Sequence, residues 1–382
     1  MRTEGFTESV IREMTRLCTT HDGINLAQGF PNFPAPAVLK EAAKRAIDMD
    51  INQYAITWGA PSLRHALART YADLYGMSVD PDTMLTVTCG STEAMVSTLL
   101  AIVDPGDEVI VFEPFYENYG PDAAICGARP VFVPLRPPEN TFDHAELRAA
   151  FSSRTKAIIV NSPNNPSGRV FTRDELELIA SLCREHDVIA VTDEIYEHIL
   201  YTGKHIPLAT LDGMAERTVT ISGASKTFSV TGWRVGWIVA PPRLSGGIRK
   251  VHDFLTVGAP APLQEAVAAG LEMGPAYYRD LADHYRVRRD TLFATLERAG
   301  FRPRLPEGAY YILCDISGFG QNDDVRFAHR LVAEVGVAGV PGSSFFARPE
   351  LGRDLIRFTF CKTADVLEEA GERLLRAREV LS

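Results

Sequence analysis

Between residues 84 and 241, short runs rich in valine and isoleucine alternate with helical stretches. Runs such as EVIVFEP and KAIIVNSP are apolar almost throughout, which is typical of strands that helices cover on both faces. Helical sequences such as TRDELELIASLCREHD separate them. This alternation predicts an α/β fold with a mostly parallel, seven-stranded sheet between helices. The expected strands lie in segments 84–90, 108–114, 129–135, 156–163, 188–196, 218–226 and 234–241.

The two ends of the chain predict a second, smaller α+β domain. A long periodic helix is expected over 276–300, and the strand-like segments AYYILCDIS and LIRFTFCK follow it. A final amphipathic helix is expected over 364–380, with one apolar face formed by Val366, Leu367, Ala370, Leu374 and Leu375. We therefore assign 41–275 to a large domain, and 1–40 with 276–382 to a small domain. The proline-rich stretch FPNFPAPAVL should carry the chain from the small domain into the large one.

Composition excludes several classes of protein. The 382 residues carry a formal net charge of -10 and no lysine- or arginine-rich run, so no nucleic-acid partner is expected. No apolar run reaches the length of a membrane span, and the N-terminal sequence does not resemble a signal peptide. The six cysteines form no C-x-x-C pair, which argues against disulfides and against a metal site. We expect a cytoplasmic protein.

Polar residues follow several of the expected strands, and in open α/β sheets ligands bind beyond the carboxyl ends of the strands. Ser91 and Thr92 open a helix, where backbone amides can bind an anion, although an ordinary N-cap explains them equally well. Asn165 lies in NSPNNPSG and is either a turn residue or a side-chain donor. Asp193 ends a strand that should be buried, so its carboxylate needs a partner. That partner is either an arginine or a protonated heterocycle, with Tyr196 a short distance away.

Lys226 is surrounded by small residues in SGASKTFSVTGWRVGW, at the end of an expected strand. Small neighbours leave room beside the amine for a bulky group that is not protein. An amine that is partly buried near a second cation, here Arg234, has a lowered pKa and becomes a nucleophile toward aldehydes. The planar guanidinium of Arg234 suits a phosphate group. A phosphate site, a carboxylate for a ring nitrogen and a reactive lysine together describe the binding site of pyridoxal 5'-phosphate.

The sequence resembles the fold-type I, class I aminotransferases, and within them the branch of the kynurenine, glutamine and methionine aminotransferases. Segments that carry the resemblance occur in the family's order along nearly the whole chain: NLAQGFPNFPAP, NQYAITWGAPSLR, EPFYENY, NSPNNPSG, TDEIYEH, SKTFSVTGWRVGW and LIRFTFCK. The resemblance implies the fold of the pyridoxal-phosphate-dependent transferases, pyridoxal 5'-phosphate as cofactor, and a homodimer with shared active sites. It also implies amino acids and 2-oxo acids as substrates.

The resemblance assigns roles around the cofactor ring. Lys226 matches the lysine that forms a Schiff base with the cofactor, and Asp193 matches the partner of the pyridine nitrogen. Tyr196 and Asn165 match the groups that bind the phenolic oxygen of the ring. Tyr116, in EPFY, lies where the family stacks an aromatic side chain on the cofactor. Lys226, Asp193 and Tyr196 are therefore the expected catalytic residues.

Further roles concern the phosphate and the substrate. Ser91, Thr92 and Arg234 match phosphate contacts, and Tyr54 matches a tyrosine that reaches the phosphate of the neighbouring subunit. Arg357 matches the arginine that binds the substrate α-carboxylate, next to the backbone amide of Gly29. Many relatives have a phosphate-binding serine three residues before the lysine, where this chain has glycine. The candidates for a replacement hydroxyl are Ser225 and Ser222, which flank Gly223 and Ala224.

The expected activity is a ping-pong transfer of the amino group of an L-amino acid to a 2-oxo acid. We expect aromatic amino acids, methionine, glutamine or kynurenine as donors, because Phe30, Phe33, Trp58 and Tyr116, together with residues of the partner subunit, predict an aromatic pocket. The alternative for Phe30 and Phe33 is packing at the domain hinge. The same scaffold also supports β-elimination, as in cysteine-conjugate β-lyases, and cyclisation or oxidation. A non-catalytic regulator that binds the cofactor is disfavoured by the acidic chain, and a purely structural protein leaves Lys226 unexplained.

Overall fold

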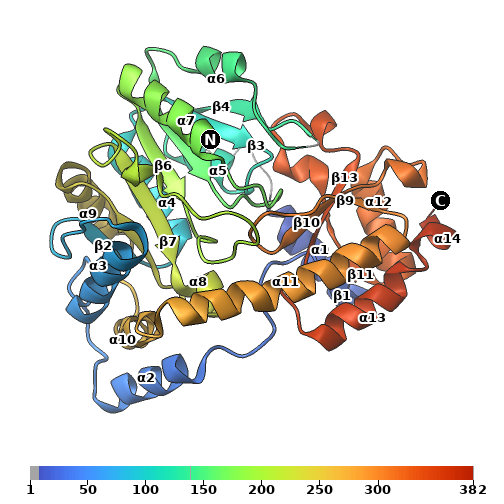
Figure 1. The fold of residues 1–382 in the computed structure, drawn as a ribbon, viewed down its shortest axis with the longest axis horizontal. Coiled ribbons are helices and arrows are strands. Elements are labelled where there is room, and N and C mark those ends of the chain that lie inside the picture. Colours follow the sequence, from blue (N-terminus) through green and yellow to red (C-terminus); the bar gives the residue numbers. More distant parts are fainter. Residues whose placement is uncertain (1–7, 138, 382) are drawn as a thin grey trace.

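The computed structural model describes residues 8–137 and 139–381, so residues 1–7 of the predicted small domain lie outside the described part. A larger body contains a seven-stranded sheet, and a smaller body is built from the C-terminal part of the chain and from α1 (Val10–Thr20) (Figure 1). No helix among the described residues is long and apolar enough to cross a membrane.

The large sheet confirms the prediction of seven strands in a mostly parallel arrangement. Its order is β2-β8-β7-β6-β5-β3-β4, and only β8 runs antiparallel to its neighbours. The strands are β2 (Leu85–Thr88), β3 (Glu108–Glu113), β4 (Arg129–Pro134), β5 (Thr155–Asn161), β6 (Ile189–Asp193), β7 (Thr218–Gly223) and β8 (Gly236–Val239). Because β5, β6 and β7 are parallel, their carboxyl ends meet at one edge of the sheet.

Helices cover both faces of this sheet, which explains the nearly continuous apolar strands. Alternate residues of β3 and β5 point to opposite faces, so that Val109 and Ile159 join one core and Ile110 and Ile158 the other. The first face is covered by α4 (Ser91–Ile102), α5 (Tyr119–Ile125) and α9 (Pro242–Thr256). The second is covered by α6 (His144–Ala150) and α7 (Arg173–Glu185). At the edge beside β2, α3 (Pro61–Tyr75) and α2 (Ala37–Asp48) pack with α10 (Ala261–Leu271).

The smaller body has the expected α+β composition. Its four-stranded sheet has the order β12-β13-β10-β9, with antiparallel pairing throughout. The strands are β9 (Arg302–Pro303), β10 (Tyr311–Asp315), β12 (Val340–Pro341) and β13 (Leu355–Thr359), and β1 (Ile24–Asn25) pairs separately with β11 (Val337–Ala338). The helices α1, α12 (Asp324–Arg330) and α13 (Ala364–Leu374) contact these strands.

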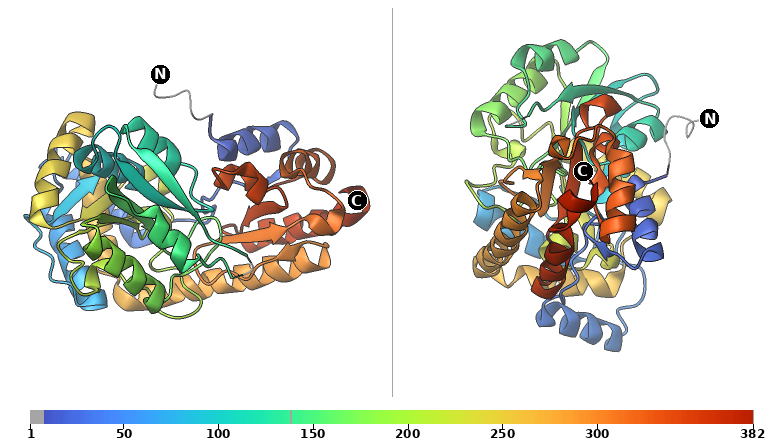
Figure 2. Two further views of the ribbon diagram at one scale, coloured as in Figure 1. Left: turned by 90° about the horizontal axis from the view of Figure 1, so that it is seen from above. Right: turned by 90° about the vertical axis from the view of Figure 1, so that its right-hand side faces the viewer.

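The long helix α11 (Gly274–Arg298) connects the two bodies. In the left-hand view of Figure 2, α11 extends along the lower side of both bodies. Near its start, the hydroxyl of Tyr277 donates a hydrogen bond of 2.7 Å to the carbonyl of Thr227 in the large body. Its later turns pack against α13 and β9 of the small body. The predicted domain boundary at residue 275 falls at the start of this helix and stays a prediction.

The C-terminal helix differs from the prediction in one respect. A single helix was expected over 364–380, but α13 ends at Leu374 and a separate helix, α14 (Ala377–Leu381), follows. Leu367, Ala370 and Leu374 are buried as expected. Leu375 is 39% exposed, so its place on the buried face was wrong. Its backbone is still helical, with φ of -58° and ψ of -22°, so this residue lies at the border of the apolar face.

Candidate active site

A cavity of about 330 Å³ lies at the carboxyl ends of β5, β6 and β7. Its walls come from α1, from the segment after β1, from the start of α4, from the loop after β3 and from β10. The cavity brings together ten of the residues singled out in the sequence: Gly29, Ser91, Thr92, Tyr116, Asn165, Asp193, Tyr196, Ser225, Lys226 and Arg234. They come from distant parts of the sequence, and the parallel strands place them together.

Lys226 lies in the short helix α8 (Ala224–Thr227), directly after β7. Its Nζ donates a hydrogen bond of 3.3 Å to the carbonyl of Gly29 across the cavity. Burial lowers the pKa of the Lys226 amine to about 8, and the guanidinium groups of Arg234 and Arg357 act in the same direction. About a tenth of the amine is therefore uncharged at pH 7, far more than for an ordinary lysine, and nucleophilic attack on an aldehyde requires this uncharged form.

Asp193 is the last residue of β6, and its side chain is buried. The hydroxyl of Tyr119 donates a hydrogen bond of 2.7 Å to Oδ2, and the amide of Ile195 donates one of 3.3 Å to Oδ1. Burial raises the pKa of Asp193, whereas the hydrogen bond from Tyr119 and the charge of Lys226 lower it. Within residues 8–137 and 139–381 no arginine or lysine forms an ion pair with Asp193. This excludes the arginine alternative and leaves the carboxylate available to a cation in the cavity.

The start of α4 and Arg234 form an anion-binding corner. Gly90, with φ of 82°, precedes the first turn of α4, and Ser91 and Thr92 line the cavity there. A Cβ atom at Gly90 would overlap the guanidinium of Arg234, so only glycine allows that group to lie beside the helix N-terminus. Among the described residues, Arg234 donates to two backbone carbonyls, at 3.1 Å to Thr231 and 3.5 Å to Cys89, and to no carboxylate. A helix N-terminus and a guanidinium with no carboxylate bonded to it suit a phosphate group.

The two serines considered as replacements for a hydroxyl at position 223 lie in different environments. Ser225 lines the cavity. Ser222 is buried and donates its hydroxyl to Oε1 of Glu197 at 2.6 Å, outside the cavity, so it does not supply the missing group. At Gly223 itself, a Cβ atom would lie 3.1 Å from Cα of Gly236, which leaves little room for a side chain.

Arg357 borders the cavity without lining it. The residue is fully buried in β13, and its Nη1 donates to Oδ1 of Asn165 at 2.8 Å, while Nη2 donates to the carbonyl of Ala27 at 2.6 Å. The ring of Tyr311 lies over the guanidinium, with the ring centre 4.2 Å from Cζ of Arg357. Nε has no hydrogen-bond partner among the described residues. The guanidinium is therefore already held in place by Asn165 and Ala27.

Tyr54, a further predicted site residue, does not line the cavity. Its side chain is 85% exposed, and it belongs to a loop between α2 and α3. Other large apolar side chains on this part of the surface are also exposed, among them Met49 at 71% and Phe254, in α9, at 92%. The single chain does not bring Tyr54 to its own active site.

The predicted aromatic pocket is partly wrong. Phe30 and Tyr116 line the cavity. Phe33 instead packs on α11, with its ring centre 5.1 Å from that of His284, and does not line the cavity, so its alternative role at the domain hinge stays a prediction. Trp58 lies beneath the guanidinium of Arg249, at 5.0 Å, and does not line the cavity. Apolar patterns do not distinguish a pocket wall from packing between elements.

Three further cavity residues were missed in the sequence. Asn161 ends β5, and its Nδ2 donates to the carbonyl of Asp193 at 2.9 Å, which fixes the end of β6. Tyr119 binds the Asp193 carboxylate, and the hydroxyl of Tyr311 lies 3.1 Å from that of Tyr196. The motifs NSPNNPSG and EPFYENY contain the first two, and AYYILCDIS contains the third. Motif membership was therefore an available signal, but side-chain direction was not.

The fit to pyridoxal 5'-phosphate follows from these observations. A largely desolvated lysine amine, a buried carboxylate without a cation and an anion-binding corner surround one cavity of suitable size. Fold and site together define a pyridoxal-phosphate-dependent enzyme of the α/β transferase type. Residues 21–374 match the family described as Aminotransferase class I and II, and the chain belongs to that family. It is an aminotransferase, and pyridoxal 5'-phosphate is its cofactor.

Similar proteins cover nearly the whole chain. A probable N-succinyldiaminopimelate aminotransferase, DapC, from Mycobacterium tuberculosis is 40% identical, over 98% of this chain and 97% of that protein. Human kynurenine–oxoglutarate transaminase 1 is 39% identical, over 95% of this chain and 94% of that protein. The structure of YbdL from Escherichia coli, identified as a methionine aminotransferase, has a TM-score of 0.95 at 37% identity, with 98% of both chains covered.

Proposed function

We propose that this aminotransferase uses amino acids with a long, uncharged side chain as donors, such as aromatic amino acids, methionine, glutamine or kynurenine. The observation that carries this proposal is the aromatic wall of the cavity, formed by Phe30, Tyr116 and Tyr311 around the Lys226 amine. Flat or extended apolar side chains pack well against such a wall. The names of the kynurenine and methionine aminotransferases among the similar proteins support the same class.

Each of the following cavity residues has a separate role in the proposed reaction. When bound, pyridoxal 5'-phosphate supplies a ring that takes up the electron pair left at the substrate α-carbon. With the cofactor bound, Lys226 would remove the proton from that carbon as general base and deliver it, as general acid, to the C4' carbon of the cofactor. Asp193 holds a proton at the cofactor's ring nitrogen through charge pairing. Tyr196 and Asn165 donate hydrogen bonds to the phenolic oxygen, and Tyr116 stacks on the ring.

The remaining site residues hold the reactants in place. Ser91, Thr92, Ser225 and Arg234 bind the phosphate group in the corner at the start of α4. Arg357 binds the substrate α-carboxylate, assisted by the backbone amide of Gly29, and so orients the α-carbon–hydrogen bond. Orientation of this kind contributes several of the roughly 7–11 kcal/mol that oriented reactions gain.

A second candidate substrate carries an additional carboxylate at the end of a long side chain. Arg12, an exposed residue of α1, lines the mouth of the cavity and provides a cation there. A distal carboxylate pairs well with a guanidinium. The similarity to a probable N-succinyldiaminopimelate aminotransferase supports this candidate.

A panel of amino acids tests the substrate proposal. Purified enzyme loaded with cofactor is mixed with one amino acid at a time, without any 2-oxo acid, and the cofactor's absorption is followed. Conversion to the amino form of the cofactor is expected with aromatic amino acids, methionine, glutamine or kynurenine, because their side chains fit the aromatic wall. Conversion only by N-succinyldiaminopimelate would favour the second candidate. Conversion by aspartate alone would contradict both.

We also propose that the enzyme is a homodimer in which each subunit completes the active site of the other. The exposed apolar side chains of Met49, Tyr54 and Phe254 support an interface on this part of the surface. In such a dimer, Tyr54 reaches the cofactor phosphate of the neighbouring subunit. We further propose that the two domains divide at residue 275. We also propose a cytoplasmic location, because the cysteines show no C-x-x-C pair or disulfide framework, which suits a reducing compartment.

Tyr54→Phe provides the test of shared sites. Loss of a hydrogen bond to a charged phosphate is expected to weaken cofactor affinity about tenfold or more. At a cofactor concentration too low to load the Tyr54→Phe dimer, mixed dimers of Tyr54→Phe and Lys226→Ala subunits should be active, because one of their two sites contains both wild-type residues. A mixture no more active than the sum of its two components under that condition, or a monomer by sedimentation, would contradict the proposal.

A further inference from the structure

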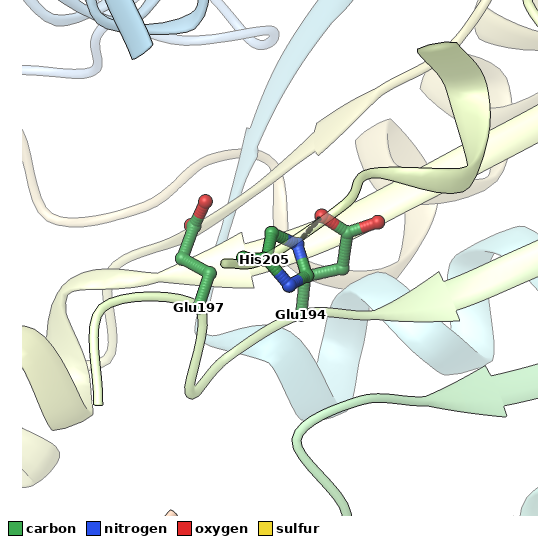
Figure 3. A group of neighbouring side chains, drawn as sticks. All are labelled: Glu194, Glu197 and His205. Atoms are coloured by element: carbon green, nitrogen blue, oxygen red, sulfur yellow. Dashed lines mark hydrogen bonds and ion pairs between the residues drawn. The ribbon is translucent and has the colours of Figure 1, made fainter. Parts of the chain in front are cut away.

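The loop after β6 presents its side chains to two different environments. Asp193 and Tyr196 line the cofactor cavity. Glu194 and Glu197 are only 2% and 5% exposed and lie outside that cavity, next to His205 (Figure 3). The stretch that holds the cofactor-binding carboxylate therefore also carries two buried carboxylates that the proposed reaction does not use.

Hydrogen bonds account for all four oxygens of these two carboxylates. His205 Nε2 donates to Oε2 of Glu194 at 2.6 Å, and the hydroxyl of Thr192 donates to Oε1 at 2.7 Å. Ser222 and Tyr75 each donate to one oxygen of Glu197, both at 2.6 Å. The ligand atoms of Glu194, Glu197 and His205 lie within 4.8 Å of one another, a spacing that a metal ion can use. Since every oxygen already has a donor, hydrogen bonding explains the cluster without an ion.

The charge of Glu194 in this cluster acts on the neighbouring carboxylate of Asp193. Asp193 and Glu194 are consecutive buried carboxylates; burial is the main cause that raises the pKa of Asp193, and the charge of Glu194 adds a smaller effect in the same direction. His205 pairs directly with Glu194, and both side chains are at most 5% exposed. Although burial opposes protonation, the charge and hydrogen bond of Glu194 raise the pKa of His205. The pair therefore places the imidazole ring of His205, held by a hydrogen bond, beside the second carboxylate.

The other groups around His205 do not provide a second cation. The ring of Tyr75, from α3, lies 5.7 Å from the imidazole in an edge-on arrangement, and Glu197 is an additional acid. Burial lowers the pKa of His198 to about 3, so this neighbouring histidine is uncharged at neutral pH. Among the described residues, no lysine or arginine lies within 4 Å of the carboxyl oxygens of Glu194. His205 is therefore the group that compensates the charge of Glu194.

We propose that His205 is a positioning residue that neutralises Glu194, so that neighbouring Asp193 keeps its negative charge for the ring nitrogen of pyridoxal 5'-phosphate. The inference rests on the proposed role of Asp193. It assigns to the Glu194–His205 pair an effect on cofactor affinity that acts through Asp193, since neither residue lines the cavity.

His205→Gln tests the charge effect, because glutamine keeps a hydrogen-bond donor and removes the cation. We expect cofactor affinity, measured by titrating the apoenzyme with pyridoxal 5'-phosphate and following absorbance, to fall about tenfold, the equivalent of a shift of one pKa unit at Asp193. The matched control is Tyr75→Phe, which removes a donor to Glu197 and leaves the Glu194–His205 pair intact. Its affinity should stay within about twofold of wild type.

The double variant Glu194→Gln/His205→Gln separates charge compensation from a general loss of packing. It removes both charges, so affinity should return to within about twofold of wild type, although two residues have changed. Melting temperatures of the apoproteins show whether each variant folds. An unchanged affinity in His205→Gln, or a double variant as weak as the single one, would overturn the inference alone. Wild-type protein that does not bind the cofactor would overturn the proposed role of Asp193 as well.

Discussion

Lys226→Ala is expected to reduce amino-group transfer by at least about 10²- to 10⁴-fold, the range that a positioned general acid and base contributes. The physical reason is that Lys226 provides the uncharged amine in the cavity, with a pKa lowered to about 8 by burial. No other lysine lines the cavity within the described residues. The measurement is the rate of cofactor conversion by a saturating amino acid in a stopped-flow spectrophotometer.

Two controls define the role of Lys226. Lys156→Ala, at an exposed position near the start of β5, changes a lysine at the opposite end of the strands and should leave the rate unchanged. A small primary amine added to Lys226→Ala should restore part of the rate, because it can carry the same proton. Near-normal turnover of Lys226→Ala without added amine would rule out the proposed role.

Arg357→Ala is expected to raise the KM for both amino acids and 2-oxo acids about a hundredfold, with a smaller effect on kcat. Truncation of one partner of a buried, hydrogen-bonded charge pair costs about 2–5 kcal/mol, and each 1.4 kcal/mol corresponds to a factor of ten. Arg357 is suited to this pair because Asn165 and Ala27 already hold its guanidinium. Steady-state kinetics with both substrates measures the effect.

Further variants and substrates identify the cause of that change. Arg357→Lys keeps the charge but loses the planar pair of donors, so its KM should lie between those of the wild type and of Arg357→Ala. Arg326→Ala, at an exposed position of α12, should behave as wild type. An amine that lacks the α-carboxylate should react equally with wild type and Arg357→Ala. An unchanged KM for amino acids would place the carboxylate site elsewhere.

Most of the fold could be predicted because its signals are local. The seven strands are apolar almost throughout, since helices cover them on both faces, and this pattern is visible in any one strand, for example Val109 to Phe112. In a parallel sheet, the carboxyl ends of strands share one edge. Residues such as Asn165, Asp193 and Lys226, which follow different strands, could therefore be placed in one site before any contact was known.

The sequence by itself therefore determined the fold class, the family and many, but not all, of the residues that line the cavity. Only the tertiary structure decided which groups face each other. In the folded chain, Ser222 binds Glu197 and does not line the cavity, and Tyr119 binds Asp193. Phe33 packs on α11, and Tyr311 lies over Arg357. The physical reason is that strand and helix periodicity are properties of neighbouring residues, whereas these contacts join side chains far apart in the chain. Such contacts depend on how helices and sheets pack, which local sequence does not specify.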